Sequence, residues 1–205
     1  MLAIIDFGYG NIESVRNMFQ KIGEKNIILA CSDDDLQKAD KLVLPGVGTF
    51  DTGMELLNQS GMREELNRQV LELHKPILGI CLGMQMLGIG SEEGKKEGLK
   101  YIPFECKRFD FQDIHLKVPH MGWDYINICD RENKLVKNIG NNPRYYFVHS
   151  YYAVCKKTEN ILMTCDYGIR FAAAVHDKNI YGTQFHPEKS HKFGMKIFEN
   201  FIKEI

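Results

Sequence analysis

The amino-acid sequence predicts an α/β fold, with a mostly parallel central sheet flanked by helices and antiparallel strands in the C-terminal half. Two observations support this class. In the first half, short apolar runs alternate with segments whose apolar residues recur every three or four positions. In the second half, segments rich in aromatic and β-branched residues follow one another with only turns between them. Strands separated by helices pair in parallel, whereas consecutive strands form hairpins.

The elements of the first half are expected in a regular order. Strands are predicted at Leu2–Ile5, Asn26–Ala30, Lys41–Leu44 and Pro76–Ile80. One amphipathic helix carries apolar residues from Ile12 to Ile22 and ends at Gly23, and a second covers Met62–Leu73. The dipeptide Pro45–Gly46 is expected to end the third strand.

The second half contains mainly predicted strands and closes with a helix. The strands are expected at Tyr101–Phe109, Tyr145–Val154, Ile161–Cys165, Phe171–His176 and Ile180–Phe185. The final helix carries an apolar face from Ile197 to Ile205. No internal repeat or long linker divides the chain, so residues 1–205 are expected to form a single domain.

Composition and charge exclude several function classes. The 205 residues carry 26 basic and 27 acidic side chains without a basic stripe, which gives nucleic-acid binding little support. Apolar runs of about 4–6 residues fall far short of the roughly 20 that a membrane helix needs. The start MLAIIDFGYG lacks the pattern of a secretion signal, and the six cysteines form no CxxC. We therefore expect a cytoplasmic protein with free thiols, most of them small buried hydrophobes.

The stretch GICLG at residues 79–83 has the form of a nucleophile elbow with sulfur in place of oxygen. Glycines on both sides allow a sharp turn from strand to helix, which lifts Cys81 out of the sheet. The sulfur then lies at the positive end of the helix, and the amide of Leu82 points toward a developing oxyanion. A buried structural cysteine in a tight turn is the alternative interpretation.

A thiol nucleophile needs a base, and the stretch QFHPE at residues 184–188 supplies one. His186 follows a predicted strand, and alternate residues of an extended segment point to the same side. Glu188 can thus approach one imidazole nitrogen while the other faces the thiol. A His-Pro turn closing a hairpin is the simpler alternative.

The loop PGVG at residues 45–48 follows a strand and lies at the carboxyl edge of the sheet, where ligands bind in open α/β folds. It lacks the phosphate-binding patterns, so we expect it to present backbone amides to substrate or oxyanion. His74, His115, His176 and His191 have no partner pattern, and no spacing typical of a metal site occurs, so no metal and no cofactor are predicted.

Several motifs occur in one order along the chain: PGVG, GICLGMQ, SEEG, VPHMGWD, RYYFVHSYY and QFHPEKS. Together they resemble the class I (triad) glutamine amidotransferases, and within them the glutaminase subunits of imidazole glycerol phosphate synthase, which act in histidine biosynthesis. The resemblance runs from Ile4 to the C-terminus and implies a flavodoxin-like sheet. It also implies a Cys81, His186 and Glu188 triad that hydrolyses L-glutamine to glutamate and ammonia through a γ-glutamyl thioester.

The resemblance assigns further residues. The oxyanion hole would be formed by Leu82 and by the loop amides of Val47 and Gly48. Substrate contacts would come from Gly46, Gln85, Glu93, His149, Ser150 and Tyr151.

Ammonia would pass to a (β/α)8-barrel cyclase subunit, which would face Met121, Trp123 and Asp124. Asp124 departs from the pattern, which has Asn there, and the glycines of GIG at residues 88–90 should shorten the helix after the elbow. Three alternatives remain open: a paralogue that supplies ammonia for amidation of a bacterial surface sugar, a cysteine hydrolase unrelated to ammonia transfer, and a non-enzymatic subunit.

Overall fold

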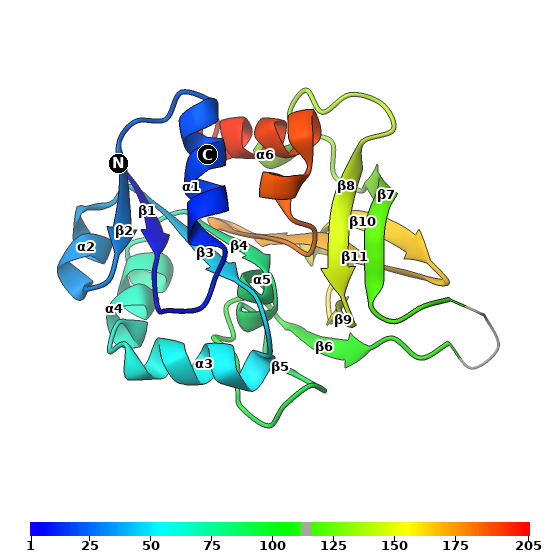
Figure 1. The fold of residues 1–205 in the computed structure, drawn as a ribbon, viewed down its shortest axis with the longest axis horizontal. Helices are drawn as coiled ribbons and strands as arrows, with labels where there is room; N and C mark the ends of the chain where they lie inside the picture. Colours follow the sequence, from blue (N-terminus) through cyan, green and yellow to red (C-terminus); the bar gives the residue numbers. More distant parts are fainter. Residues whose placement is uncertain (112–115) are drawn as a thin grey trace.

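The computed structural model describes residues 1–111 and 116–205, so His115 lies outside the described residues. Within them the strands form one 12-stranded sheet (Figure 1). Its main path runs in the order β2 (Ile27–Ala30), β1 (Leu2–Ile5), β3 (Lys41–Gly46), β4 (Ile77–Cys81), β12 (Ile180–Thr183), β11 (Ile169–Asp177), β10 (Ile161–Tyr167), β7 (His120–Ile128) and β8 (Arg144–His149). A side branch joins β11 through β9 (Tyr151–Cys155) to β6 (Phe104–Arg108) and β5 (Gly90–Ser91).

The sheet changes direction at β12. Strands β2, β1, β3, β4 and β12 pair in parallel, and β12, β11, β10, β7 and β8 pair in antiparallel fashion. The parallel half comes from the alternating part of the sequence, as predicted. The last parallel strand, β12, comes from the end of the chain. Its pairing with β4 places the carboxyl ends of two strands that are far apart in the sequence next to each other.

Helices cover both faces of the parallel half (Figure 1). Because side chains alternate along a strand, Leu2 and Ile4 of β1 pack on one face and Ala3 and Ile5 on the other. The first face is covered by α1 (Ile12–Lys21) and α6 (His191–Lys203), whose rings Phe19 and Phe198 stack at 4.1 Å. The second face is covered by α2 (Asp33–Lys38), α3 (Phe50–Gln59), α4 (Arg63–Asn67) and α5 (Leu82–Met86).

Several predicted strand ends are shifted by one to three residues, as in β6, which begins at Phe104, and β12, which ends at Thr183. Two further predictions are wrong in ways that affect the sheet. The third strand does not stop at Pro45, because β3 continues to Gly46 and pairs Pro45 with Ile80. The pairing of β3 with β1 already ends at Val43, so Pro45 has a strand neighbour on one side, where a missing N–H is tolerated. The segment Tyr145–Val154 is two strands rather than one: β8 pairs with β7, whereas β9 pairs with β6 and β11.

The remaining short elements follow from local sequence. The predicted helix at residues 62–73 is α4 continued by a π-helical turn, Arg68–Glu72. The glycines after Met86 do shorten α5, which has five residues. Two helices and two strands were not predicted: α2 has Leu36 as its single buried residue, α3 contains Gly53, β5 has only two residues, and β7 exposes large side chains. None of the helices in the described ranges has the length and apolar content that a membrane span needs.

Candidate active site

The strand–turn–helix around Cys81 has the geometry of a nucleophile elbow. Cys81 is the last residue of β4, α5 begins at Leu82, and the backbone of Cys81 has φ 53° and ψ −109°. A Cβ on Gly83 would lie 1.8 Å from the carbonyl oxygen of Leu44, and one on Gly79 would lie 2.7 Å from the carbonyl oxygen of Gly83. The glycines are therefore required by close backbone packing, as predicted.

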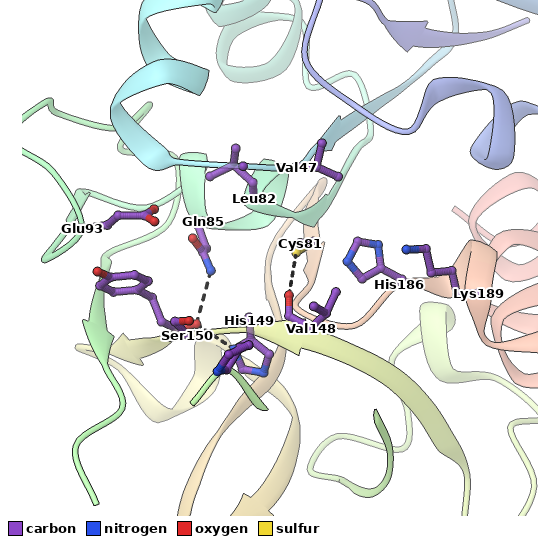
Figure 2. A pocket seen from close by; sticks show the side chains of 13 residues that line it. Val47, Cys81, Leu82, Gln85, Glu93, Val148, His149, Ser150, His186 and Lys189 are labelled. Carbon is purple, nitrogen blue, oxygen red and sulfur yellow. Dashed lines mark hydrogen bonds between the residues drawn. The ribbon is translucent and has the colours of Figure 1, made fainter. Parts of the chain in front are cut away.

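His186 reaches Cys81 because their strands are neighbours. β12 lies parallel to β4, with Thr183 opposite Ile80, so both carboxyl ends meet at one edge. Cys81 follows Ile80 directly, and His186 follows Thr183 three residues later. In Figure 2 the Cys81 sulfur and the His186 ring lie beside each other on one cavity. This edge is where open α/β sheets bind ligands.

His186 and Glu188 form a buried pair. Nδ1 of His186 lies 2.7 Å from Oε1 of Glu188, and the two side chains are 3 % and 1 % exposed. Pro187 begins a 3₁₀ turn, Pro187–Lys189, so the expected extended segment stops at His186 and the turn brings the carboxylate back to the ring. The Ser190 hydroxyl fixes this turn by donating to the His186 carbonyl at 2.6 Å.

The pair determines where the imidazole carries its proton. Because the Glu188 carboxylate can only accept, Nδ1 of His186 donates to it, and Nε2 faces the thiol side. Among the described residues, Nε2 is buried and has no hydrogen-bond partner. Burial by itself lowers the pKa of His186, but the Cys81 side chain and then Glu188 outweigh it and raise this pKa to about 10. The arrangement therefore favours the protonated, imidazolium form of His186 beside Cys81.

The cavity in front of Cys81 has a volume of about 360 Å³. It brings together most of the residues predicted for substrate and oxyanion contacts (Figure 2). Its lining consists of Val47, Gly48, Cys81, Leu82, Gln85, Glu93, Pro119, Val148, His149, Ser150, Tyr151, His186 and Lys189. Two predicted residues do not line it: Gly46 packs beneath the elbow, where a Cβ would meet the amide nitrogen of Gly83 at 2.7 Å, and Glu188 lies behind His186.

Sequence reasoning missed Pro119, Val148, Lys189 and the buried Gln184. Gln184 is the first residue of the QFHPE stretch and Lys189 follows its last, so both could have been found from it. Nε2 of Gln184 lies 3.8 Å from the Cys81 sulfur, and Oε1 of Gln184 accepts from Gln85 at 3.1 Å. Within the described residues no group of three or more His, Cys, Asp or Glu side chains could hold a metal ion.

An acidic side chain and one loop complete the pocket. Glu93 accepts from the amide of Phe50 at 2.8 Å, and burial raises the pKa of its carboxyl group. Gly48 has φ +89°, and a Cβ there would lie 1.8 Å from the Tyr9 hydroxyl oxygen. That hydroxyl also accepts from the amide of Thr49 at 3.1 Å, which ties the PGVG loop to the N-terminal loop.

Met121, Trp123 and Asp124 lie on β7, outside the cavity. Met121 is 62 % exposed and Trp123 is 41 % exposed, so core packing does not explain the tryptophan. Trp123 stacks on His191 with ring centroids 5.4 Å apart, and Arg144 lies over the same ring. We call the exposed surface formed by Met121, Trp123 and Tyr125 the β7 face. Asp124 alternates with these residues, is 30 % exposed and lies on the side of β7 that carries His120.

A family model described as "Glutamine amidotransferase class-I" matches residues 3–205. This chain belongs to the class I glutamine amidotransferases. A curated relative named "Imidazole glycerol phosphate synthase subunit HisH 2", from Methanococcus maripaludis, is 51 % identical over 205 residues and covers 100 % of both chains. A protein of the same name from Pseudomonas aeruginosa is 48 % identical and covers 99 % of both.

Solved structures of other amidotransferases share the fold of this class I chain. A putative GMP synthase component from Thermoplasma acidophilum aligns with a TM-score of 0.72 at 18 % identity, covering 98 % of this chain and 91 % of that one. The glutaminase domain of the Trypanosoma brucei CTPS, solved with bound acivicin, aligns with a TM-score of 0.68 at 16 % identity, covering 98 % and 93 %. The prediction of a flavodoxin-like α/β fold is confirmed.

Proposed function

We propose that this chain is the glutaminase subunit of a cytoplasmic imidazole glycerol phosphate synthase and that residues 1–205 form one catalytic domain. The full-length relatives that carry this subunit name support the proposal. The observation that carries it is the convergence of Cys81 and His186 at one cavity, from two neighbouring strand ends, with Glu188 bound to His186 on the side away from the cavity.

Cys81 is the nucleophile in this proposal. Its sulfur attacks the side-chain amide carbon of glutamine, and a tetrahedral intermediate forms. His186 has taken the thiol proton on Nε2 and gives it to the departing ammonia, while Glu188 keeps Nδ1 protonated and stabilises the imidazolium. Water then attacks the γ-glutamyl thioester, with His186 as the base, and glutamate is released.

The oxyanion would be bound by the amide of Leu82 and by a loop amide of Val47 or Gly48, which line the same cavity. Gly46 contributes by letting the loop pack against the elbow. Glutamine would be held by Gln85, Glu93, His149, Ser150 and Tyr151, the polar side of the cavity.

Ammonia would be delivered to a (β/α)8-barrel cyclase subunit. We assign the β7 face to that subunit because it exposes three large side chains on one strand: Met121, Trp123 and Tyr125. Exposed aromatic and methionine side chains are enriched in protein interfaces. The bound cyclase is expected to raise the glutaminase rate of the isolated chain.

The experiment compares Cys81→Ala with the unchanged protein, each with the cyclase subunit bound. We expect Cys81→Ala to abolish glutamate release and to prevent labelling by a diazo-ketone analogue of glutamine. Cys31→Ala removes an exposed thiol and serves as the matched control. Normal glutamate release from Cys81→Ala would refute the mechanism.

The ammonia acceptor is tested separately. We expect glutamine to support formation of imidazole glycerol phosphate when the chain is mixed with the cyclase, and free ammonium to replace glutamine when Cys81→Ala is used. Glutamate release that is never coupled to this product, together with amidation of a surface sugar by another synthase, would favour the paralogous role.

A further inference from the structure

Two histidines outside the triad form a buried pair beside the cavity. His120 of β7 and His149 of β8 are opposite each other in the antiparallel register. Nδ1 of His120 lies 3.0 Å from Nε2 of His149, and both side chains are buried. The proposed mechanism gives His120 no role, although a buried polar pair of this kind costs free energy unless it is satisfied.

Aromatic rings fix the planes of this pair. The His120 ring lies nearly parallel to Tyr167, with centroids 4.0 Å apart, and nearly parallel to Phe147 at 4.7 Å. Phe109 meets the same ring edge-on at an interplanar angle of 89°. Since packing restricts ring rotation, the placement of protons on the ring nitrogens is the main remaining freedom.

The pair connects the cavity with the partly exposed Asp124 of β7. On the inner side, Nδ1 of His149 lies 2.8 Å from the carbonyl oxygen of Tyr151, which also accepts from Gln85 at 3.3 Å. On the outer side, Nε2 of His120 lies 3.4 Å from Oδ2 of Asp124, whose side chain is 30 % exposed. Gln85 continues inward through Gln184, so the contacts reach the Cys81 sulfur.

The donors and acceptors determine the direction of these contacts. A carbonyl can only accept, so Nδ1 of His149 carries its proton. Burial lowers the pKa of His149 to about 3, so the ring is neutral and its Nε2 accepts from Nδ1–H of His120. Asp124 is also an acceptor. The two neutral rings therefore have two N–H protons for three contacts: His149 with the Tyr151 carbonyl, His120 with His149, and His120 with Asp124. The 3.4 Å contact between His120 and Asp124 is the one without a proton.

We propose that His120 and Asp124 are positioning residues for the glutaminase reaction: His120 holds His149 in the tautomer that fixes the Tyr151 carbonyl in the glutamine pocket, and the Asp124 carboxylate competes for the same proton. The proposal rests on the proposed function, because the pocket it orders is the glutamine site. A cationic group of a docked partner that pairs with Asp124 would remove the competition. An amide at position 124 would do the same, since its NH₂ can donate to Nε2 of His120.

Two measurements test this at pH 7. The first is ¹⁵N NMR of histidine-labelled, isolated protein, which reports which ring nitrogen is protonated. We expect the Nδ1–H tautomer for His120 and His149 in the unchanged protein and in Asp124→Asn, with the signals assigned by their loss in His120→Gln and His149→Gln. An Nε2–H tautomer of His149 would overturn the proposal without any measurement of activity.

The second measurement is the dissociation constant of glutamine in the Cys81→Ala background, where no turnover occurs. We expect His120→Phe, which keeps an aromatic ring and removes the donor, to weaken binding about tenfold, the effect of one hydrogen bond of typical strength. His120→Gln, which restores an N–H donor, should recover binding to within about threefold, and Asp124→Asn should tighten it about threefold.

The outcomes separate the two proposals. Equal losses in His120→Phe and His120→Gln, no loss in either, or weaker binding in Asp124→Asn would overturn the positioning role. If the Cys81→Ala reference itself fails to bind glutamine while the expected tautomers are seen, the failure belongs to the proposed function.

Discussion

The substitution Glu188→Gln tests the triad with the smallest change of shape. Glu188 and His186 are almost completely buried and 2.7 Å apart, so the contact is a charge-assisted hydrogen bond shielded from water. Such bonds contribute about 1.5–3 kcal/mol. If the contribution is made mainly to the transition state, where the imidazolium donates to ammonia, kcat/KM should fall about 10- to 150-fold at 1.36 kcal/mol per tenfold.

The assay is steady-state glutamate release with the cyclase subunit bound, and kcat and KM are determined separately. The loss should fall mainly on kcat, because Glu188 lies behind His186 and does not line the cavity. Glu13→Gln, at a 61 % exposed side chain on α1, is the control and should leave both constants unchanged. A Glu188→Gln variant within twofold of the unchanged protein would refute the assignment of Glu188 as the residue that orients the base.

Three further predictions concern stability. The pKa of His186 is raised to about 10, so protonation of His186 stabilises the folded protein. This stabilisation is complete below the ordinary histidine pKa near 6.5 and is lost as the pH rises toward 10. Urea unfolding should therefore show a fall in the free energy of unfolding over this pH range, and the fall should be smaller in His186→Gln. Gly83→Ala places a Cβ 1.8 Å from the carbonyl oxygen of Leu44, so it should destabilise the protein by about 3 kcal/mol or prevent folding. Gly140→Ala is the control, because a Cβ there meets nothing within 4 Å. Thermal unfolding should show this control to be nearly neutral. Asn200→Ala removes two 2.8 Å hydrogen bonds from a buried amide to backbone carbonyls and should lower the free energy of unfolding by about 2–3 kcal/mol; a change below about 0.5 kcal/mol would contradict this.

Local sequence was sufficient where the controlling interactions are local. The elbow around Cys81 follows from glycines next to a strand end. The Glu188 contact was predicted from an extended segment, whereas the structure makes it through the turn Pro187–Lys189, which is equally local. The helices α1 and α6 follow from apolar periodicity. In each case the relevant atoms are separated by a few residues, so the pattern of residue types contains the information.

Local sequence failed where the structure depends on which strands pair with one another. β7 was missed because its outward positions carry the large apolar or aromatic side chains of Met121, Trp123 and Tyr125, so its alternation of burial is not matched by an alternation of polar and apolar residues. The split at Ser150 was missed because β8 and β9 differ only in which strands they pair with.

The sequence by itself determined most of the elements and the proposed nucleophile, base and carboxylate, because backbone strain, periodicity and turn chemistry act over short distances. Only the tertiary structure placed β12 beside β4, which joins His186 to Cys81 across more than a hundred residues, and paired β7 with β8, which brings His120 against His149. Strand pairing of this kind depends on the packing of the whole sheet, and no short stretch of sequence encodes it.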